Sequence, residues 1–303
     1  MARDDSGARL DHFLARSLPG ASRAVVRRLI ADGLVLVDGR ARGKGCPVAE
    51  GEVVEVRGYV APGTWAPVPA PDLDVEVVHE DEDLVAVNKP PHLPCHPLRP
   101  DERRTVASAL VALYPELAGI GTKREAGLVH RLDTTTSGVL VFARRPQAYD
   151  DLVGQLRGGS AEKEYLALVE GDASGLGVIE TPLVPSRRRT LALQPAAAGR
   201  RRGSQPASSR VEARERLGGF TLVAVTIRSG RRHQVRAHLA TAGHPIAGDR
   251  HYGARLEAPV DRPFLHAAEV RLVSPSSGLP LALRADLFPD LATCLVELRS
   301  RPR

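Results

Sequence analysis

The stretch HRLDTTTSGVLVFAR, from His130 to Arg144, places a carboxylate directly before a strongly apolar segment. One interpretation is structural, since Asp133 and Thr134–Thr136 could close a turn through side chain to backbone hydrogen bonds. The other is chemical, because loops at strand ends commonly carry functional groups. A carboxylate in such a loop can act as a nucleophile, as a base, or as a stabiliser of developing positive charge. The string by itself leaves both interpretations open.

The segment after Asp133 is one of several strands expected beyond Leu73. Strand patterns are found in VEVVHE, DLVAVNKP, GVLVFAR, YLALVEG and FTLVAVTIRSG, and helical patterns in TVASALVALYP, AYDDLVGQLRGG and RRHQVRAHLATAG. This mixture predicts an α+β domain over residues 73–303, built on a mostly antiparallel mixed sheet. Asp133 would then lie at an edge of that sheet.

Residues 1–57 indicate a separate small α/β domain. A first helix has an apolar face formed by Leu10, Phe13 and Leu14. Ser22 can cap a second helix, and Gly33 can end it. The following LVLVDG alternates and turns at Asp38-Gly39, which predicts a hairpin.

The second predicted helix carries three arginines on one side: Arg23, Arg27 and Arg28. This basic ridge is either an ordinary solvated helix face or a surface that binds phosphates. A Pro- and Ala-rich linker follows at 58–72, because GYVAPGTWAPVPAPD has neither a helical nor a strand period. Residues 187–202 indicate an exposed basic loop.

Composition and charge narrow the class of protein. A net charge of +6 and a pI near 9.6 suggest a polyanionic partner. No stretch approaches the about 20 apolar residues that span a bilayer, so we expect a cytoplasmic protein without membrane contact. Three scattered cysteines and the Pro-flanked pair His92 and His96 do not form a metal-binding pattern. A phosphate-binding glycine loop is also missing from the sequence.

Five motifs together identify a family resemblance. HRLDTTTSG is similar to the signature loop of the RluA-type pseudouridine synthases, which modify ribosomal or transfer RNA. DLVAVNKP resembles that family's opening strand, KEYLALVEG its tyrosine strand, GRRHQVRAHLATAGHPIAGDRHYG its arginine motif, and FLHA a further core strand. Residues 7–56 resemble the small RNA-binding domain of the ribosomal protein S-four type. The resemblance spans nearly the whole chain.

The resemblance implies three catalytic residues. Asp133 would be the essential carboxylate, and Arg236 the cation that keeps it ionised, since burial alone raises the pKa of a carboxyl group. Tyr165 would stack on the target base and assist proton removal. The alternatives are a surface helix arginine for Arg236 and core packing for Tyr165.

The resemblance also implies RNA contacts. Arg131 would fill the gap left by an extracted uridine, with phosphate binding as its alternative role. Further expected contacts are Lys89, His233, Gln234, Arg23, Arg27 and Arg28. Two departures from the family pattern, Pro91-His92 and Arg232 in place of threonine, put the local loop shape and the target in doubt.

The expected function is isomerisation of uridine to pseudouridine in structured RNA, with ribosomal RNA as the favoured target and transfer RNA as the alternative. We expect a monomer that needs no cofactor or metal. A non-catalytic RNA-binding or ribosome-assembly factor on the same fold is the first rival, and a carboxylate-based nucleoside glycosidase is the second. The glycosidase should need a second acidic residue and should release free base.

Overall fold

The computed structural model describes residues 7–59, 65–186, 189–192 and 203–301, which belong to two compact units. The division between the units falls at residues 64 and 65 of the sequence, inside the expected linker. Part of that linker packs on the second unit, since buried Ala70 donates its N–H to Ser108 O at 3.0 Å.

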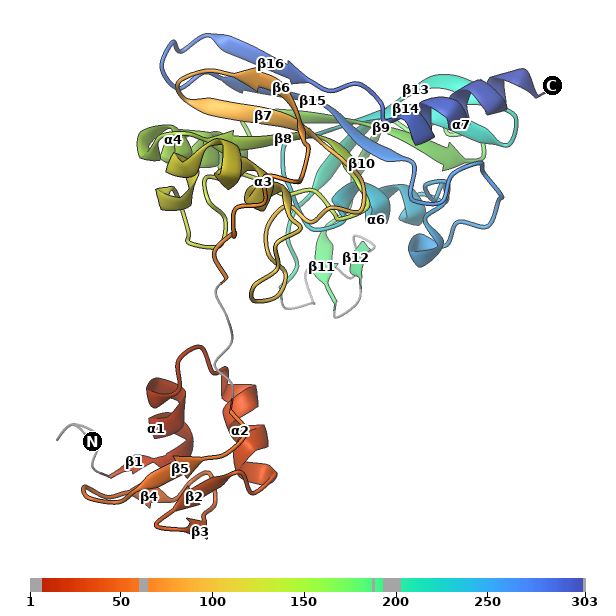
Figure 1. Ribbon diagram of the computed structural model, residues 1–303. Coiled ribbons are helices and arrows are strands. Elements are labelled where there is room, and N and C mark those ends of the chain that lie inside the picture. The colour runs from red at the N-terminus through yellow and green to blue at the C-terminus, as the bar shows by residue number, and fades with distance from the viewer. Residues whose placement is uncertain (1–6, 60–64, 187–188, 193–202, 302–303) are drawn as a thin grey trace. The chain divides into compact units, whose positions relative to one another are not determined.

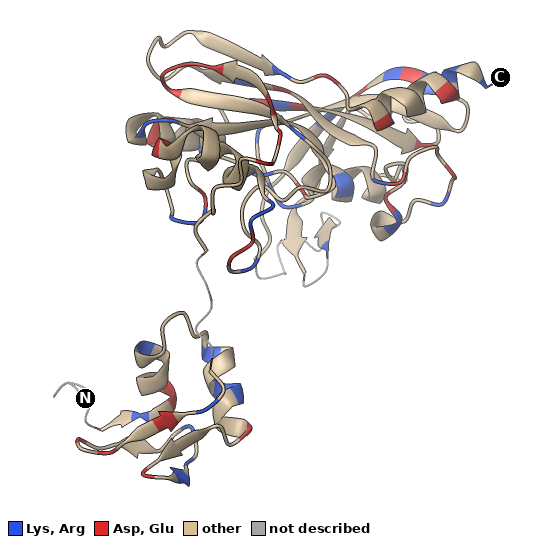
Figure 2. Ribbon diagram, in the orientation of Figure 1, with Lys and Arg blue, Asp and Glu red and all other residues tan. Residues whose placement is uncertain are grey.

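The first unit contains the two predicted helices, α1 (Leu10–Ser17) and α2 (Arg23–Ala31). The hydroxyl of Ser22 accepts a hydrogen bond from Val25 N and caps α2, and Gly33 follows its end with a positive φ of 69°. The helices pack on the strands through a small core of Leu10, Leu14, Val26, Leu29, Val35, Val37 and Val48. Arg23, Arg27 and Arg28 are exposed on α2, which carries several basic residues in Figure 2.

The predicted hairpin is also present. β2 (Val35–Val37) pairs with β3 (Arg40–Ala41) and β5 (Val54–Val56), whereas β1 (Ala8–Arg9) pairs with β4 (Pro47–Val48). Asp38 and Gly39 form the two-residue turn with φ values of 48° and 74°. Positive φ at both positions is what this tight hairpin turn requires.

The second unit is built on a nine-stranded sheet with the order β10-β13-β14-β9-β15-β8-β7-β6, in which β16 pairs with β15 (Figure 1). Only β15 and β8 are parallel; the other pairs are antiparallel, which confirms the predicted mostly antiparallel mixed sheet. The strands are β6 (Glu76–Glu80), β7 (Leu84–Lys89), β8 (Ser137–Ala143), β9 (Glu162–Glu170), β10 (Val178–Glu180), β13 (Ser208–Leu217), β14 (Phe220–Ile227), β15 (Leu265–Val273) and β16 (Pro280–Arg284).

Within the residues that the structure describes, the helices beside the sheet are α3 (Val106–Leu113), α4 (Pro146–Gly158), α6 (Gln234–Thr241) and α7 (Pro289–Ser300). Figure 1 shows α3 and α6 below the sheet, where β11 (Leu183–Pro185) and β12 (Thr190–Ala192) form a small hairpin. Helix α7 is tied to β13 by hydrogen bonds of 2.7–3.2 Å from Arg299 to Glu215. Short 3-10 turns lie at Pro115–Gly119 and Arg250–Tyr252.

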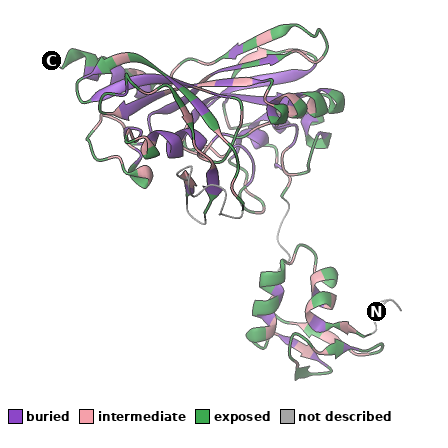
Figure 3. Ribbon diagram, turned by 180° about the vertical axis from the view of Figure 1, so that it is seen from behind, coloured by how far each residue is buried: buried purple, intermediate pink, exposed green. Residues whose placement is uncertain are grey.

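The centre of the sheet is buried (Figure 3). Every residue of β7 and β8 is buried, which suits their apolar runs LVAV and GVLVFA and includes the polar Asn88, Lys89 and Ser137. Strand β8 lies so close to β15 that a Cβ at Gly138, whose φ is 113°, would overlap the backbone of Ala267. This close approach fixes the strand end from which the Asp133 loop emerges.

Within the described ranges, no helix is both long enough and apolar enough to cross a membrane. Arg187, Arg188 and Arg200–Arg202 of the expected basic loop lie outside the residues that the structure describes.

Candidate active site

The loop that presents Asp133 is held by three buried side chains that bind its backbone. Cys95 Sγ lies 3.3 Å from both the N and the O of Leu132. Lys89 Nζ donates to Thr134 O at 3.1 Å, and Arg262 Nη1 donates to Thr135 O at 3.0 Å. The carbonyls on both sides of Asp133 are therefore fixed, so its carboxylate projects from a rigid frame.

Arg262 links this loop to the last helix of the chain. Its guanidinium is 2% exposed and donates to both carboxylate oxygens of Asp290 at 2.6 and 3.1 Å. It also donates to Ser137 Oγ at 3.1 Å, and Ser137 Oγ lies 2.9 Å from His266 Nδ1. One side chain thus connects the Asp133 loop, the start of β8 and helix α7.

Lys89 does not occupy the place expected for an RNA contact. It is completely buried, and its ammonium also donates to Pro90 O at 2.7 Å and Leu93 O at 2.8 Å. Burial lowers the pKa of Lys89 to about 8. The structure therefore gives Lys89 a structural role in place of the expected RNA contact, because all three N–H donors bind backbone carbonyls inside the protein.

Asp133 and Arg236 meet as the resemblance implies. Arg236 Nη1 donates to Asp133 Oδ2 at 2.9 Å. The same guanidinium binds buried Asp249 through two parallel hydrogen bonds of 2.7 and 2.9 Å. Burial by itself lowers the pKa of Arg236, but its hydrogen bonds to Asp249 and the charges of both carboxylates raise that pKa above the ordinary arginine value. Arg236 is therefore a permanent cation that Asp249 orients toward Asp133.

His233 and Tyr252 complete this side of the site. His233 adopts a left-handed conformation, with φ 54°, just before α6. Its Nε2 lies 3.7 Å from Asp133 Oδ1, and its Nδ1 lies 3.0 Å from Tyr252 Oη. Burial lowers the pKa of His233 more strongly than the charge of Asp133 raises it. The Tyr252 ring packs 4.9 Å from the Arg236 guanidinium, and its hydroxyl accepts from Thr190 N at 2.8 Å.

Tyr165 projects from β9 and is 7% exposed. Burial, followed by the charge of Asp133, raises the pKa of Tyr165 well above the ordinary tyrosine value. The phenol therefore keeps its proton at neutral pH. Its ring can support a planar base, whereas a role as proton acceptor would require a different environment.

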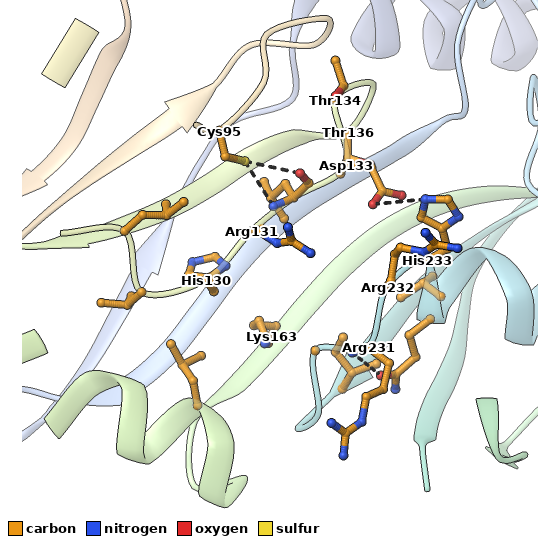
Figure 4. Close-up of a pocket in the computed structure, with 18 of the residues that line it drawn as sticks. Cys95, His130, Arg131, Asp133, Thr134, Thr136, Lys163, Arg231, Arg232 and His233 are labelled. Carbon is orange, nitrogen blue, oxygen red and sulfur yellow. Dashed lines mark hydrogen bonds and ion pairs between the residues drawn. The ribbon is translucent and has the colours of Figure 1, made fainter. Parts of the chain in front are cut away.

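A cavity of about 900 Å³ lies in front of Asp133, Tyr165 and Arg236 (Figure 4). Of the expected site residues, the structure brings Asp133, Tyr165, Arg236, Arg131, His233 and Gln234 to its walls. Arg131 is exposed, in keeping with contact to a large substrate. Arg23, Arg27 and Arg28 belong to the other compact unit.

Gln234 lines the cavity, but its carboxamide is only 2% exposed. The carboxamide oxygen accepts from Ser229 Oγ and Arg231 N, and its nitrogen donates to Ser208 O. These internal hydrogen bonds occupy the carboxamide that was expected to contact RNA. Gln234 instead holds the turn that precedes α6.

Sequence reasoning missed Asp249, Tyr252, Lys163, Cys95 and Arg262. Asp249 and Tyr252 lie within the arginine motif. Their closeness to Arg236 in the sequence could have indicated that an acidic and an aromatic side chain contact that arginine. Cys95 and Arg262 carry no local signal, because their partners lie far along the chain. Where side chains are described, no group of three or more His, Cys, Asp or Glu residues could hold a metal ion.

Two segments of the chain match known protein families. Residues 83–241 match the RNA pseudouridylate synthase family, and residues 8–54 match the S4 domain family. An RNA pseudouridine synthase of Chloroflexus aurantiacus, described as uncharacterized, is 39% identical over 294 residues, which cover 97% of this chain and 90% of the relative. The ribosomal large subunit pseudouridine synthase D of Escherichia coli K12 is 31% identical over 316 residues, covering 99% of this chain and 93% of the relative.

A solved structure supports the fold. The human RNA pseudouridylate synthase domain containing 4 protein superposes with a TM-score of 0.59 at 24% identity, covering 75% of this chain and 95% of that chain. The matched family includes Asp133, Tyr165 and Arg236 within its bounds. The chain is a member of the RNA pseudouridine synthase family of RluA type, enzymes that isomerise uridine in RNA, and it carries an N-terminal S4 domain.

Proposed function

We propose that this enzyme converts one or more uridines of large-subunit ribosomal RNA to pseudouridine. The names of relatives such as the Escherichia coli enzyme support this target. The observation that carries the chemistry is the 2.9 Å hydrogen bond between Asp133 and Arg236 on the wall of a cavity. Transfer RNA is the alternative target.

Asp133 acts at the sugar of the target uridine. The reaction breaks the bond between C1′ and N1, turns the freed base, and joins C5 to C1′, while the proton lost from C5 is replaced by one gained at N1. Asp133 can attack C1′, take a sugar proton, or stabilise a cation-like sugar. Arg236 binds only Oδ2, which supports a role for Oδ1 in this chemistry.

The other site residues divide between the base and the RNA backbone. Tyr165 packs under the target base, and Arg131 occupies the space that this base leaves when it is extracted. His233 contacts the RNA near Asp133. Arg23, Arg27 and Arg28 bind phosphates, which position the enzyme without reading sequence.

We also propose how the whole chain is organised. Residues 1–57 form the RNA-binding domain, 58–72 the linker and 73–303 the catalytic domain. The enzyme acts as a monomer in the cytoplasm, where its RNA substrate is made, and it needs no cofactor or metal.

The target can be tested by carbodiimide mapping of pseudouridines in RNA from cells with the gene, without it, and with Asp133→Asn in its place. We expect at least one large-subunit ribosomal pseudouridine that requires the wild-type gene. Loss of a transfer RNA pseudouridine instead would reassign the target. Identical maps from all three strains would contradict the proposal.

A further inference from the structure

Lys163 is a buried cation on the wall of the active-site cavity, and no carboxylate in the described part of the chain forms an ion pair with it. Its side chain is on β9, the residue is 4% exposed, and its ammonium has no hydrogen-bond partner among the described residues. Burial lowers the pKa of Lys163 to about 8. A charged group that is removed from water without a partner is costly, so its presence calls for an explanation.

The two glutamates next to Lys163 do not neutralise it, because a strand turns alternate side chains to opposite faces. Glu162 pairs with Arg228 at 2.6 Å, and Glu164 lies 3.7 Å from Arg271. Lys163 shares its face with Tyr165, about 7 Å along the strand. The Lys163 ammonium therefore lies on the same face of β9, and on the same cavity wall, as Tyr165, which is proposed to support the base.

A second hydrogen-bond donor, the ring N–H of His130, lies in the surroundings of Lys163. His130 Nε2 accepts a hydrogen bond from Val141 N at 3.2 Å, so the ring proton is on Nδ1, which is buried without a partner among the described residues. Burial, with a smaller contribution from Lys163, lowers the pKa of His130 to about 3. Figure 4 shows Lys163 between the loop of His130 and Arg131 and the loop of Arg231.

Space beside the ammonium is kept open by Gly230. A Cβ at that position would lie 2.9 Å from Lys163 Nζ. Gly230 and Lys163 both line the cavity that Asp133 faces. The missing side chain therefore leaves the ammonium in contact with the cavity.

We propose that Lys163 donates a hydrogen bond to a carbonyl oxygen of the target uracil and holds the negative charge that the base gains on detachment. This inference rests on the proposed function. When the bond between C1′ and N1 breaks, its electron pair stays on N1 and spreads onto the ring carbonyl oxygens. The new bond from C5 to C1′ consumes that charge, and C5 then loses its proton while N1 gains one. Lys163 remains protonated throughout.

A phosphate is the other oxygen ligand that an ammonium could bind, but the position of Lys163 favours the base. Arg131, Arg231 and Arg232 are exposed around the cavity, where a solvated backbone can reach them. Lys163 is buried on the floor beside Tyr165. A fixed cation in such a dry position acts most strongly on charge that develops during the reaction.

The test compares Lys163→Met with wild type, using an unmodified transcript of large-subunit ribosomal RNA. Lys123→Met is the matched control, because Lys123 is exposed and does not line the cavity. We expect the single-turnover rate at saturating RNA to fall about 10²–10³-fold in Lys163→Met, as on removal of one oxyanion donor. RNA affinity should stay unchanged, and Lys163→Arg should retain more activity than Lys163→Met.

A rate for Lys163→Met within about threefold of wild type would overturn the inference. So would weaker binding with a salt slope reduced by about 0.7–0.9, because one lost phosphate contact has that signature. Thermal unfolding should show a melting temperature no lower than that of wild type, since an unpaired buried charge has been removed; Lys163→Gln replaces the variant if Met does not fold. If wild type itself converts no uridine, the proposed function fails independently of Lys163, and the inference fails with it.

Discussion

The substitution Asp249→Asn tests whether the Asp249 carboxylate orients Arg236, the arginine proposed to act beside Asp133. Asp249 is 1% exposed and accepts from Nε and Nη2 of Arg236. Asparagine keeps the volume but removes the charge, and its amide nitrogen would face an N–H of Arg236. The guanidinium would then lose one of its two parallel hydrogen bonds and part of its charge compensation.

Removing one partner of a buried ion pair costs about 3–5 kcal/mol. For a unit of this size each kcal/mol lowers the melting temperature by about 2–4 °C, so a decrease of roughly 6–20 °C is expected. Arg236 would also be less well placed beside Asp133, and such a misplacement can slow turnover about a hundredfold.

Scanning calorimetry and single-turnover conversion of RNA would measure both effects. Glu215→Gln is the control, since it breaks the exposed pair with Arg299 and should cost at most about 1 kcal/mol. If Asp249→Asn melted within about 2 °C of wild type and turned over normally, Asp249 would not hold Arg236 in place.

Three further predictions concern the catalytic carboxylate, the first domain and a buried lysine. Asp133→Asn should abolish turnover, while thermal melting and RNA affinity stay near wild type, because one partly exposed charge is removed without a change of volume; turnover within about tenfold of wild type would refute its role. Deletion of residues 1–60 should weaken RNA binding and make its salt dependence shallower by about two to three units, because three arginine–phosphate contacts are lost; an equal slope in both proteins would show that the α2 arginines form only a solvated face. Burial lowers the pKa of Lys89 in the folded protein to about 8, below its value in the unfolded chain. Burying the charged ammonium therefore lowers the unfolding free energy by its full amount below pH 8, and this loss disappears as pH rises toward about 10.4. Unfolding free energy measured over this range should therefore rise less in Lys89→Met than in wild type, and parallel curves would contradict the assignment.

The elements predicted best are those that local sequence determines. Asp38-Gly39 demands a tight turn, and the apolar runs of β7 and β8 belong to strands covered on both faces. Motif resemblance was enough to bring Asp133 and Arg236 together, although 103 positions separate them. These features depend on residue type and order.

The local sequence did not predict the role of a polar residue where that role depends on whether its side chain is buried. Lys89 and Gln234 have polar side chains in functional motifs, so RNA contact was a natural expectation, yet both are fully hydrogen-bonded inside the protein. Lys163 lies between two glutamates in the sequence, which suggests that their carboxylates neutralise its charge. Only the alternation of β9 turns those glutamates away and leaves the lysine on the cavity wall.

The connection from Arg262 to Asp290 has a consequence for the order in which a newly made chain becomes active. The Asp133 loop is synthesised well before α7, yet the carboxylate that pairs with Arg262 among the described residues, Asp290, belongs to α7. Until α7 emerges and docks, Arg262 is a buried cation with no carboxylate to balance it, and the loop lacks one of its three anchors. Folding that proceeds from the N-terminus therefore leaves the Asp133 loop without its Arg262 anchor until α7 has been translated. With ribosomal RNA as the proposed substrate, this order would keep the growing enzyme inactive toward the ribosome on which it is being synthesised.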